Sequence, residues 1–438
     1  MSDSPHGGTT RLDHYVDRYA TRTRGMTASE IRALFSVASR PEVVSLAGGM
    51  PNISGLPLDV VGGAIGDLIA TNGPAAMQYG SGQGEPALRE QICDVMRLEG
   101  IEAHPDDVVV TVGSQQAVDL VTRIFCDPGD VVVCEAPSYV GALGVFRAYE
   151  CDVVHVEMDA RGLVPDALRQ AIASVRAAGR TIKFLYTIPN YHNPAGVSLA
   201  PERRAEVLEI CREADILVLE DNPYGLLGFT DEPYRALRAD ESEGVIYLGS
   251  FSKTFAPGFR VGWALAPHAV REKLVLAQES ATLCPPSFSQ MAVSAYLSQH
   301  DWMGQIKQFR EMYRERRDAM VDSLADLMPA GTRWNVPDGG FYVWLTLPDG
   351  LDAKAMLPRA VTARVAFVPG TAFFADGLGA QSMRLSYCYP SPERIREGVR
   401  RLVGVVEEEM ELRETFGAAA PALGALPRGY EAPNTDLT

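Results

Sequence analysis

Residues 108–267 repeat one pattern, in which short apolar runs rich in β-branched residues alternate with helical stretches or loops. The runs are almost continuously apolar, which is typical of strands buried on both faces of a mostly parallel sheet. Between the first two runs, Ala117, Val121 and Ile124 recur at the spacing of one helix face. The pattern predicts β-α-β architecture with helices on both faces of the sheet. Seven strands are expected, at residues 108–112, 131–135, 152–158, 183–189, 216–221, 245–250 and 261–267.

The pattern changes after Pro286, where long charged helical stretches precede a hairpin-like segment, GGFYVWLTLP. Within that segment the aromatic residues Phe341, Tyr342 and Trp344 fit a strand, and core packing is the simplest interpretation of them. A last amphipathic helix follows, and its apolar positions are Ile395, Val399, Leu402 and Val406. This part of the chain predicts a second, smaller α+β domain.

Both ends of the chain lack the period of a buried face and are rich in Ala, Gly, Pro and polar residues. We therefore expect them to be flexible. Five regions are predicted: a flexible arm (1–25), a segment packing with the small domain (26–54), a large domain (55–300), a small C-terminal domain (301–414) and a flexible tail (415–438).

Composition and charge narrow the class of protein. The 438 residues are 46% hydrophobic and 22% charged, close to the averages for folded globular proteins. Lys and Arg total 40 against 56 for Asp and Glu, so the formal net charge is −16. Such a chain repels a polyphosphate backbone overall, and we expect no nucleic-acid partner.

The cysteines and the apolar runs indicate the compartment. The seven cysteines are scattered and never spaced as C-x-x-C, which favours reduced thiols over a disulfide framework or a zinc site. No apolar run approaches the ~18 residues that a membrane span requires. The N-terminus lacks the basic start and apolar centre of a secretory signal. We expect a cytoplasmic protein with no membrane partner and no metal.

Candidate chemistry lies where the predicted strands end, because ligands of open α/β sheets gather at that edge. The run ending at Ser250 leads into Ser252 and Lys253, and Arg260 follows seven residues later. A lysine at such a position is most often a solvated surface charge. Here two hydroxyls and a planar cation surround it, which suits an amine nucleophile beside a phosphate-bearing ligand.

Three other strand ends carry polar residues. Asp221 stands where its run stops, and the loop after the run at 183–189 contains Asn193 before a proline. The first run opens into Gly113-Ser114-Gln115 at a helix start, where free N–H groups and the helix dipole favour a phosphate. Taken singly, each is also compatible with ordinary capping or turn chemistry.

Together these motifs make the sequence resemble the class I and II aminotransferases, which bind pyridoxal 5'-phosphate (PLP). The segments SLAGGMP, GSQQAVDL, EAPSYVGAL, YLGSFSK and VAFVPGTAFF carry the resemblance, which covers nearly all of the chain except its two ends. It is strongest to the subgroup that contains 2-aminoadipate and aromatic amino-acid aminotransferases. The resemblance implies the fold type I of PLP-dependent transferases: a large domain with a mostly parallel, mixed seven-stranded sheet between helices, plus a smaller α+β domain.

The resemblance also implies a role for each candidate residue. Lys253 would attach PLP covalently and then act as the base, Asp221 would pair with the pyridine nitrogen, and Tyr224 would contact the ring hydroxyl; these three are the catalytic candidates. The other cofactor-binding candidates are Asn193 at the ring hydroxyl, Tyr139 on the ring face, and Ser114, Gln115, Ser250, Ser252 and Arg260 at the phosphate.

The implied substrates are small molecules, an L-amino acid and a 2-oxo acid such as 2-oxoglutarate. Arg384 would take the substrate carboxylate, with Gly49 and Asn193 beside it. Tyr79 matches a tyrosine that reaches a phosphate across a subunit interface, so the resemblance implies a homodimer. The motif after Asn193 departs from many relatives, because Ala195 stands where they have Thr or Ser.

Some alternatives stay open at this point. The same scaffold supports other PLP reactions, such as elimination or decarboxylation, and regulatory proteins use it to sense an effector. The stretch before Pro41 is short for a DNA-binding module with a linker, which favours an enzyme. His192 could touch substrate, although loop histidines are more often solvated or structural.

The amino donor is expected to be aromatic or 2-aminoadipate-like first, with arylglycine-type or branched-chain amino acids next. An acidic side chain could meet an arginine of the N-terminal segment, and an aromatic one could meet an aromatic residue there. The arginine candidates are Arg24, Arg32 and Arg40, and the aromatic candidates are Tyr15, Tyr19 and Phe35.

Overall fold

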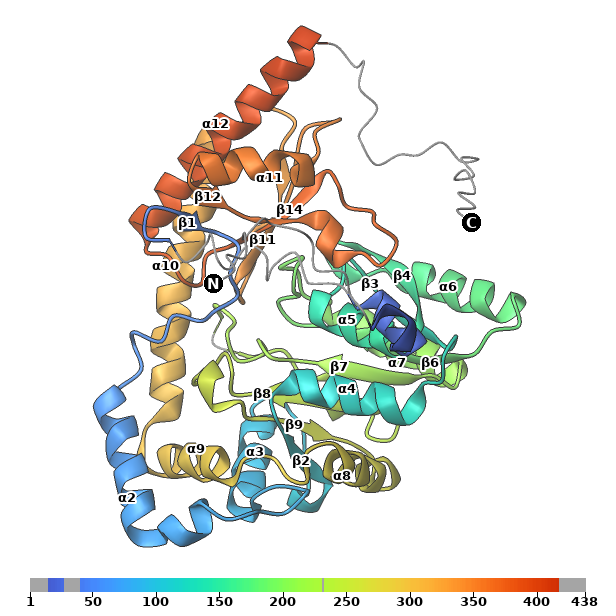
Figure 1. The fold of residues 1–438 in the computed structure, drawn as a ribbon, viewed down its shortest axis with the longest axis vertical. Coiled ribbons are helices and arrows are strands. Elements are labelled where there is room, and N and C mark those ends of the chain that lie inside the picture. The colour runs from blue at the N-terminus through green and yellow to red at the C-terminus, as the bar shows by residue number, and fades with distance from the viewer. Residues whose placement is uncertain (1–14, 27–39, 231, 417–438) are drawn as a thin grey trace, which may run out of the picture.

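The structure is a computed structural model and describes residues 15–26, 40–230 and 232–416. Its larger sheet lies in the lower half of Figure 1, between two layers of helices. The strand order is β2 (Val108–Thr111), β9 (Gly262–Leu265), β8 (Val245–Ser250), β7 (Leu217–Asp221), β6 (Ile182–Thr187), β3 (Val131–Ala136), β4 (Asp152–Asp159) and β5 (Gly162–Leu163).

All seven predicted strands occur in this sheet. Strands β4, β3, β6, β7 and β8 are parallel, and β9 runs antiparallel to both β8 and β2. The prediction missed β5, an eighth strand that pairs antiparallel with the end of β4. It has two residues, too few for any hydrophobic period to appear.

The two faces of the sheet are covered by different helices, because successive side chains of a strand point to opposite sides. On β3, Val132 and Cys134 pack with one group of helices, while Val131 and Val133 pack with the other. The first group is α4 (Ser114–Phe125), α5 (Val140–Ala148) and α8 (His268–Thr282). The second is α6 (Pro165–Ala177) and α7 (Pro201–Glu213), joined toward β2 by α3 (Pro86–Arg97) and α9 (Ser287–Gln299).

A second, antiparallel sheet lies in the upper half of Figure 1. Its order is β10 (Arg333–Trp334), β11 (Tyr342–Thr346), β14 (Ser382–Ser386) and β13 (Val368–Pro369), and α10 (Trp302–Leu327), α11 (Ala353–Thr362) and α12 (Pro392–Phe416) pack around it. The predicted hairpin-like segment forms β11. The predicted final helix is α12, and its four predicted apolar positions are fully buried.

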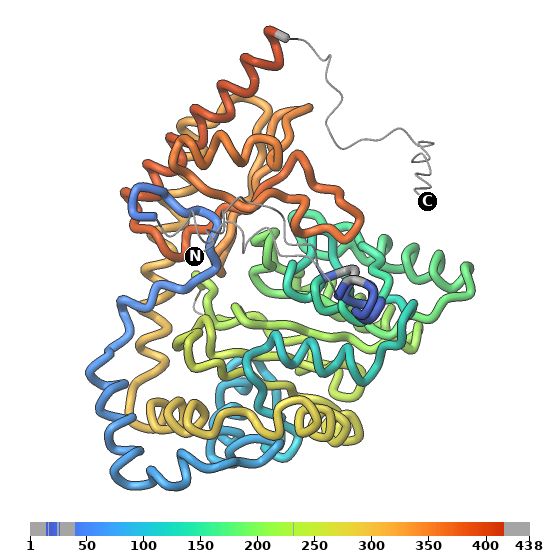
Figure 2. The backbone as a smooth tube through the Cα atoms, viewed as in Figure 1, coloured from blue at the N-terminus to red at the C-terminus, as the bar shows by residue number. Residues whose placement is uncertain are grey.

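The N-terminal segment connects the two sheets, as the blue part of the tube in Figure 2 shows. Strand β1 (Val44–Ser45) pairs in parallel with β12 (Val365–Ala366) beside the second sheet. The chain then continues to α2 (Leu58–Ala76), which packs on α9. Short 3-10 helices complete the fold: η1 (Val16–Arg18), η2 (Thr21–Gly25), η3 (Pro105–Asp107), η4 (Leu237–Ala239), η5 (Pro257–Phe259) and η6 (Gly370–Phe373).

The boundaries of the five predicted regions stay predictions, as does the flexibility of the two ends. Within the predicted arm, η2 lies next to α5, and α12 extends two residues beyond the predicted end of the small domain. All seven cysteines are free thiols. In the part of the chain that the structure describes, no helix is both long and apolar enough to cross a membrane.

Candidate active site

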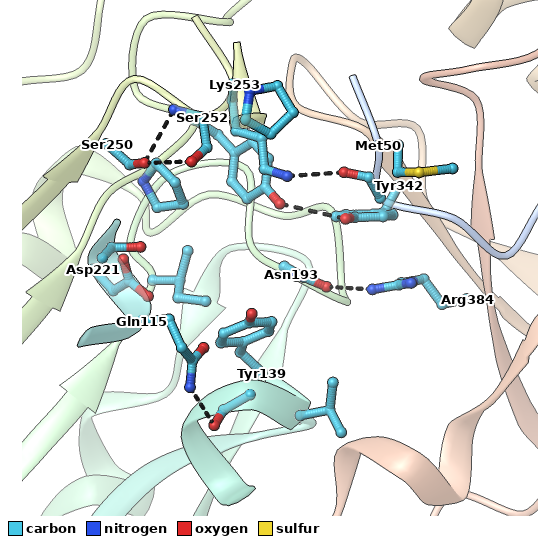
Figure 3. A pocket seen from close by; sticks show the side chains of 18 of the residues that line it. Met50, Gln115, Tyr139, Asn193, Asp221, Ser250, Ser252, Lys253, Tyr342 and Arg384 are labelled. Atoms are coloured by element: carbon cyan, nitrogen blue, oxygen red, sulfur yellow. Dashed lines mark hydrogen bonds between the residues drawn. The ribbon is translucent and has the colours of Figure 1, made fainter. Parts of the chain in front are cut away.

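A cavity of about 400 Å³ lies between the two sheets, at the carboxyl edge of the parallel strands (Figure 3). Every site residue expected from the sequence lines it except Tyr79. The predicted residues in its wall are Gly49, Ser114, Gln115, Tyr139, Asn193, Asp221, Tyr224, Ser250, Ser252, Lys253, Arg260 and Arg384. Residues separated by more than 300 positions in the chain therefore meet in one cavity, as the positions of Gly49 and Arg384 show.

The start of α4 forms one end of the cavity. Gly113 has φ +74°, and a Cβ atom there would lie 2.6 Å from Nη2 of Arg260, so only glycine fits this turn. Arg260 crosses the helix start and donates from Nη2 to the carbonyl oxygen of Val112, at 3.1 Å. Nearby, Ser250 donates from its hydroxyl to that of Ser252, at 2.9 Å. A helix N-terminus, a guanidinium and two hydroxyls together suit a phosphate.

Asp221, the last residue of β7, offers an unused acceptor to the cavity. Its side chain is 3% exposed, and Oδ2 accepts a hydrogen bond from the Tyr186 hydroxyl at 2.8 Å. Oδ1 is buried and has no hydrogen-bond partner among the described residues. Burial raises the pKa of Asp221 to about 6, against the opposing effect of the Tyr186 hydrogen bond. A ligand with an N–H group can satisfy the remaining oxygen.

Lys253 follows β8 by three residues, is partly buried and lines the cavity. Nζ donates to the carbonyl oxygen of Gly49 at 2.8 Å. Burial lowers the pKa of Lys253 to about 8; Cys388 opposes this shift, and the Arg384 and Arg260 guanidinium groups add to it. About a tenth of the amine is therefore neutral and nucleophilic at pH 7, far more than for an ordinary lysine.

Arg384, on β14, supplies a buried cation. Its Nη1 donates to Oδ1 of Asn193 at 2.9 Å, and its Nη2 donates to the carbonyl oxygen of Ala47 at 2.7 Å. Nε is buried without a partner in the described part of the chain. The guanidinium lies 4.2 Å from the ring centroid of Tyr342 and 5.0 Å from that of Phe373. A buried guanidinium held by neutral groups is suited to bind an anionic ligand.

The prediction that Tyr342 serves only core packing was incomplete. Phe341 is fully buried in the core of the second sheet, but Tyr342 lines the cavity. Its hydroxyl oxygen lies 3.3 Å from that of Tyr224. Strand alternation could have indicated this, because Tyr342 and Trp344 share the face opposite to Phe341, Val343 and Leu345. Other lining residues that were missed are Met50, Val140, Gly141, Ile188, Pro223 and Pro257.

His192 is buried behind the cavity and does not line it. Its Nδ1 accepts from the backbone N–H of Ala195 at 3.2 Å, and its Nε2 lies 3.0 Å from a carboxylate oxygen of Glu135. The same oxygen of Glu135 accepts from the N–H of Ile188 at 3.0 Å. This histidine therefore supports the loop that carries Asn193, in line with its structural interpretation.

Tyr79 is the predicted site residue that lies apart, with 76% of its surface exposed. Of the residues considered for the donor side chain, Tyr15 and Tyr19 are exposed and do not line the cavity, whereas Arg40 lines a neighbouring cavity of about 810 Å³. Met50 lies in the walls of both cavities. Arg32 and Phe35 lie outside the described residues, as does the side chain of Arg24.

Comparison with known proteins identifies the family. The family model for aminotransferase class I and II matches residues 42–402. The chain is 41% identical over 400 residues to aromatic-amino-acid aminotransferase 1 of Thermococcus litoralis, covering 91% of this chain and 96% of that protein. It is 38% identical over 379 residues to the 2-aminoadipate transaminase of Thermus thermophilus, covering 86% and 93%.

A solved structure shows the same likeness. The crystal structure of kynurenine aminotransferase from Pyrococcus horikoshii, in complex with PMP and with KYN as substrates and KYA as products, superposes with a TM-score of 0.86. The two sequences are 37% identical, and the match covers 90% of this chain and 98% of that one.

Proposed function

The chain belongs to the class I and II aminotransferases, PLP-dependent enzymes of fold type I, and on this basis we propose which substrates it uses and which residues perform the reaction. The amino donor is an L-amino acid with an aromatic, 2-aminoadipate-like or arylglycine-type side chain. The acceptor is a 2-oxo acid such as 2-oxoglutarate. The observation that carries the residue assignment is the meeting of Lys253, Asp221 and Arg384 in one cavity.

The cavity fits PLP in its hydrogen-bonding capacity. Oδ1 of Asp221 is a buried carboxylate oxygen without a partner among the described residues, which matches the protonated pyridine nitrogen of the cofactor. When bound, PLP supplies an electron sink for the bonds broken at the amino acid's α-carbon. Tyr139 would cover the ring face, and Tyr224 and Asn193 would contact the ring hydroxyl.

The phosphate group fits the end of the cavity at α4. The backbone N–H groups of Ser114 and Gln115 are at the first turn of the helix, where no intrahelical acceptor exists for them. Ser250, Ser252 and Arg260 add two hydroxyl donors and a positive charge.

Arg384 would bind the α-carboxylate of the substrate. Its two hydrogen bonds, to Asn193 and Ala47, fix the plane of the guanidinium. That orientation leaves it ready to receive a carboxylate as a bidentate partner. Gly49 lines the same cavity, and its carbonyl oxygen accepts a hydrogen bond from the Lys253 amine.

Lys253 would first hold the cofactor covalently and then move the proton. Its amine lines the cavity, where it would be placed to accept the proton from the α-carbon of the bound amino acid. An amine with a pKa near 8 is well matched to this task at neutral pH, because it is a base strong enough to take the proton and is not fully protonated beforehand.

We further propose a homodimer in which Tyr79 reaches the phosphate of the partner subunit's site. Met77, Tyr79 and Leu283 are each more than half exposed, which is unusual for large apolar side chains. The segment that carries Tyr79 lies against residues 279–287, because Cβ atoms at Gly80 and Gly82 would approach Ser287 and Glu279 within 2.5 Å. The free thiols agree with a cytoplasmic location.

One experiment tests the reaction and then the donor. The absorbance of the purified PLP-loaded protein is recorded before and after each single amino acid is added without any acceptor. Conversion to the amine form of the cofactor by aromatic amino acids or 2-aminoadipate is expected. Conversion by alanine alone would contradict the donor assignment.

The same experiment separates the alternatives. Release of ammonia together with a 2-oxo acid, without conversion of the cofactor to its amine form, would indicate elimination, and release of carbon dioxide with an amine would indicate decarboxylation. An absorbance that never changes with any amino acid would favour an effector-sensing role.

A further inference from the structure

Two buried tyrosines contact each other across the two sheets. Tyr224 follows β7 in the large sheet, and Tyr342 is the first residue of β11 in the second sheet. Each is 2% exposed, and in this structure the Tyr224 hydroxyl donates to that of Tyr342 at 3.3 Å. Both side chains line the cavity, so the pair belongs to the site as well as to the hydrophobic core of the second sheet.

The position of the Tyr342 hydroxyl is closely confined. A Cβ atom at Gly49 would lie 2.3 Å from this hydroxyl oxygen, so glycine at that position is what leaves space for it. The ring of Tyr342 faces the guanidinium of Arg384, at 4.2 Å from the centroid. Tyr342 therefore touches the residue proposed for the substrate carboxylate and the residue proposed for the cofactor hydroxyl.

The number of protons available decides which hydroxyl donates in this contact once the cofactor is bound. A tyrosine hydroxyl carries one proton and can also accept. When Tyr224 donates its proton to the ring oxygen of the cofactor, it can no longer donate to Tyr342. The contact then persists only if Tyr342 donates to the oxygen of Tyr224. Such a chain strengthens the outer hydrogen bond, because each donor polarises the next.

We propose that Tyr342 is a further active-site residue, whose hydroxyl donates to Tyr224 and strengthens the hydrogen bond from Tyr224 to the cofactor, while its ring orients Arg384. The proposal rests on the proposed function, since it assigns Tyr224 to the cofactor hydroxyl. Burial raises the pKa of Tyr342 above its ordinary value, so its hydroxyl keeps the proton that it donates.

The hydroxyl is tested by a spectroscopic pH titration of the lysine-bound cofactor. The ring oxygen of the lysine-bound cofactor carries more negative charge after this cofactor loses its proton. A stronger hydrogen bond from Tyr224 to that oxygen therefore favours the deprotonated form. Tyr224→Phe is expected to move the titration upward by about 1–2 pH units, the value of one hydrogen bond to a charged group. Tyr342→Phe is expected to move it upward by about 0.3–0.5 pH unit, a fraction of that bond.

A double variant and a control make this result specific. In Tyr224→Phe the relay is already broken, so adding Tyr342→Phe is expected to cause no further shift. Tyr313→Phe is the matched control, because Tyr313 is a buried tyrosine outside the cavity whose hydroxyl accepts from the N–H of Asn52 at 3.1 Å. It is expected to titrate as the unaltered protein does.

The ring is tested by a comparison of two substitutions. Tyr342→Phe keeps an aromatic face under Arg384, whereas Tyr342→Leu removes it. The KM for the amino acid is expected to be about fivefold higher in the Leu variant than in the Phe variant, as the loss of a buried cation–π contact implies.

Two outcomes would overturn the proposal. The first is that the cofactor titrates at the same pH in Tyr342→Phe as in the unaltered protein, while Tyr224→Phe shifts the titration. The Tyr342 hydroxyl would then not act through Tyr224. If the titration shift of the double variant equals the sum of the shifts of the two single variants, the two hydroxyls act separately. Failure of the proposed function itself is distinguishable, since the unaltered protein would then show no absorbance from bound PLP, which would also refute this proposal.

Discussion

Arg384 donates from Nη1 to Oδ1 of Asn193 at 2.9 Å, and this hydrogen bond joins β14 of the second sheet to the loop after β6 of the large sheet. Lys253 lies in the turn after β8 of the large sheet, so the proposed carboxylate site and the proposed base come from opposite sides of the cavity. Their alignment depends on the packing of one sheet against the other, which this bond helps to fix.

Replacing Arg384 by lysine keeps the charge but removes the planar fork. The KM for amino acids and 2-oxo acids is expected to rise by about 10- to 100-fold, the cost of a lost charge-assisted hydrogen bond. The absorbance of bound PLP should stay unchanged. Arg316→Lys is the control, because Arg316 is also buried, donates to the carbonyl oxygen of Cys388 at 2.6 Å and lies outside the cavity. Equal KM changes in both variants would refute the assignment.

Asp221 is expected to lower the stability of the cofactor-free protein. Burial raises its pKa from 3.8 to about 6. Between these two pH values the carboxyl group is therefore protonated in the folded state and ionised in the unfolded state. Stability from this group is present below pH 4 and is lost as the pH rises through about 6. Asp221→Asn should therefore stabilise the cofactor-free protein at pH 7.5 by up to roughly 3 kcal/mol, and should do so much less at pH 4.5.

Denaturant unfolding of the cofactor-free proteins at the two pH values measures this difference. The same substitution should weaken PLP binding, because the amide cannot pair as a carboxylate does with a protonated ring nitrogen. A variant less stable than the unaltered protein at pH 7.5 would contradict the expected cost of burying this charge.

Lys253 is expected to set the pH dependence of cofactor attachment. Only the neutral amine attacks a carbonyl, and burial lowers the pKa of this lysine to about 8. The rate of attachment after mixing with PLP should rise about tenfold per pH unit below pH 8 and level off above it. Stopped-flow absorbance measures the rate. A rate still rising tenfold between pH 9 and 10 would indicate an ordinary lysine, and Lys253→Ala should show neither attachment nor turnover.

Tyr79 is expected to serve the site of the partner subunit, which mixed dimers can test. Tyr79→Ala and Lys253→Ala proteins are unfolded together, refolded and compared with each protein refolded alone. If Tyr79 acts across the interface, each mixed dimer contains one site with both side chains intact, and activity should exceed the sum of the separate preparations. Activity equal to that sum would place Tyr79 with its own subunit's site or outside any site.

Much of the site could be predicted because it lies at strand ends. Parallel strands with β-α-β connections place all their carboxyl ends at one edge, so Asp221, Ser250 and Lys253 meet once the strands are recognised. Periodicity recognised seven of the eight strands of the large sheet, and it missed β5 because two residues carry no period.

The strands, the helices between them and the polar residues at the strand ends could be read from the sequence, because these follow from local periodicity and turn chemistry. The tertiary structure was needed to show that Tyr342 faces the cavity, that Oδ1 of Asp221 lacks a partner in the described part of the chain, and that Tyr79 is exposed and does not line the cavity of its own chain. The position of Tyr342 depends on how the second sheet packs against the first. Such long-range packing sums many weak contacts between distant segments and leaves no period in the sequence.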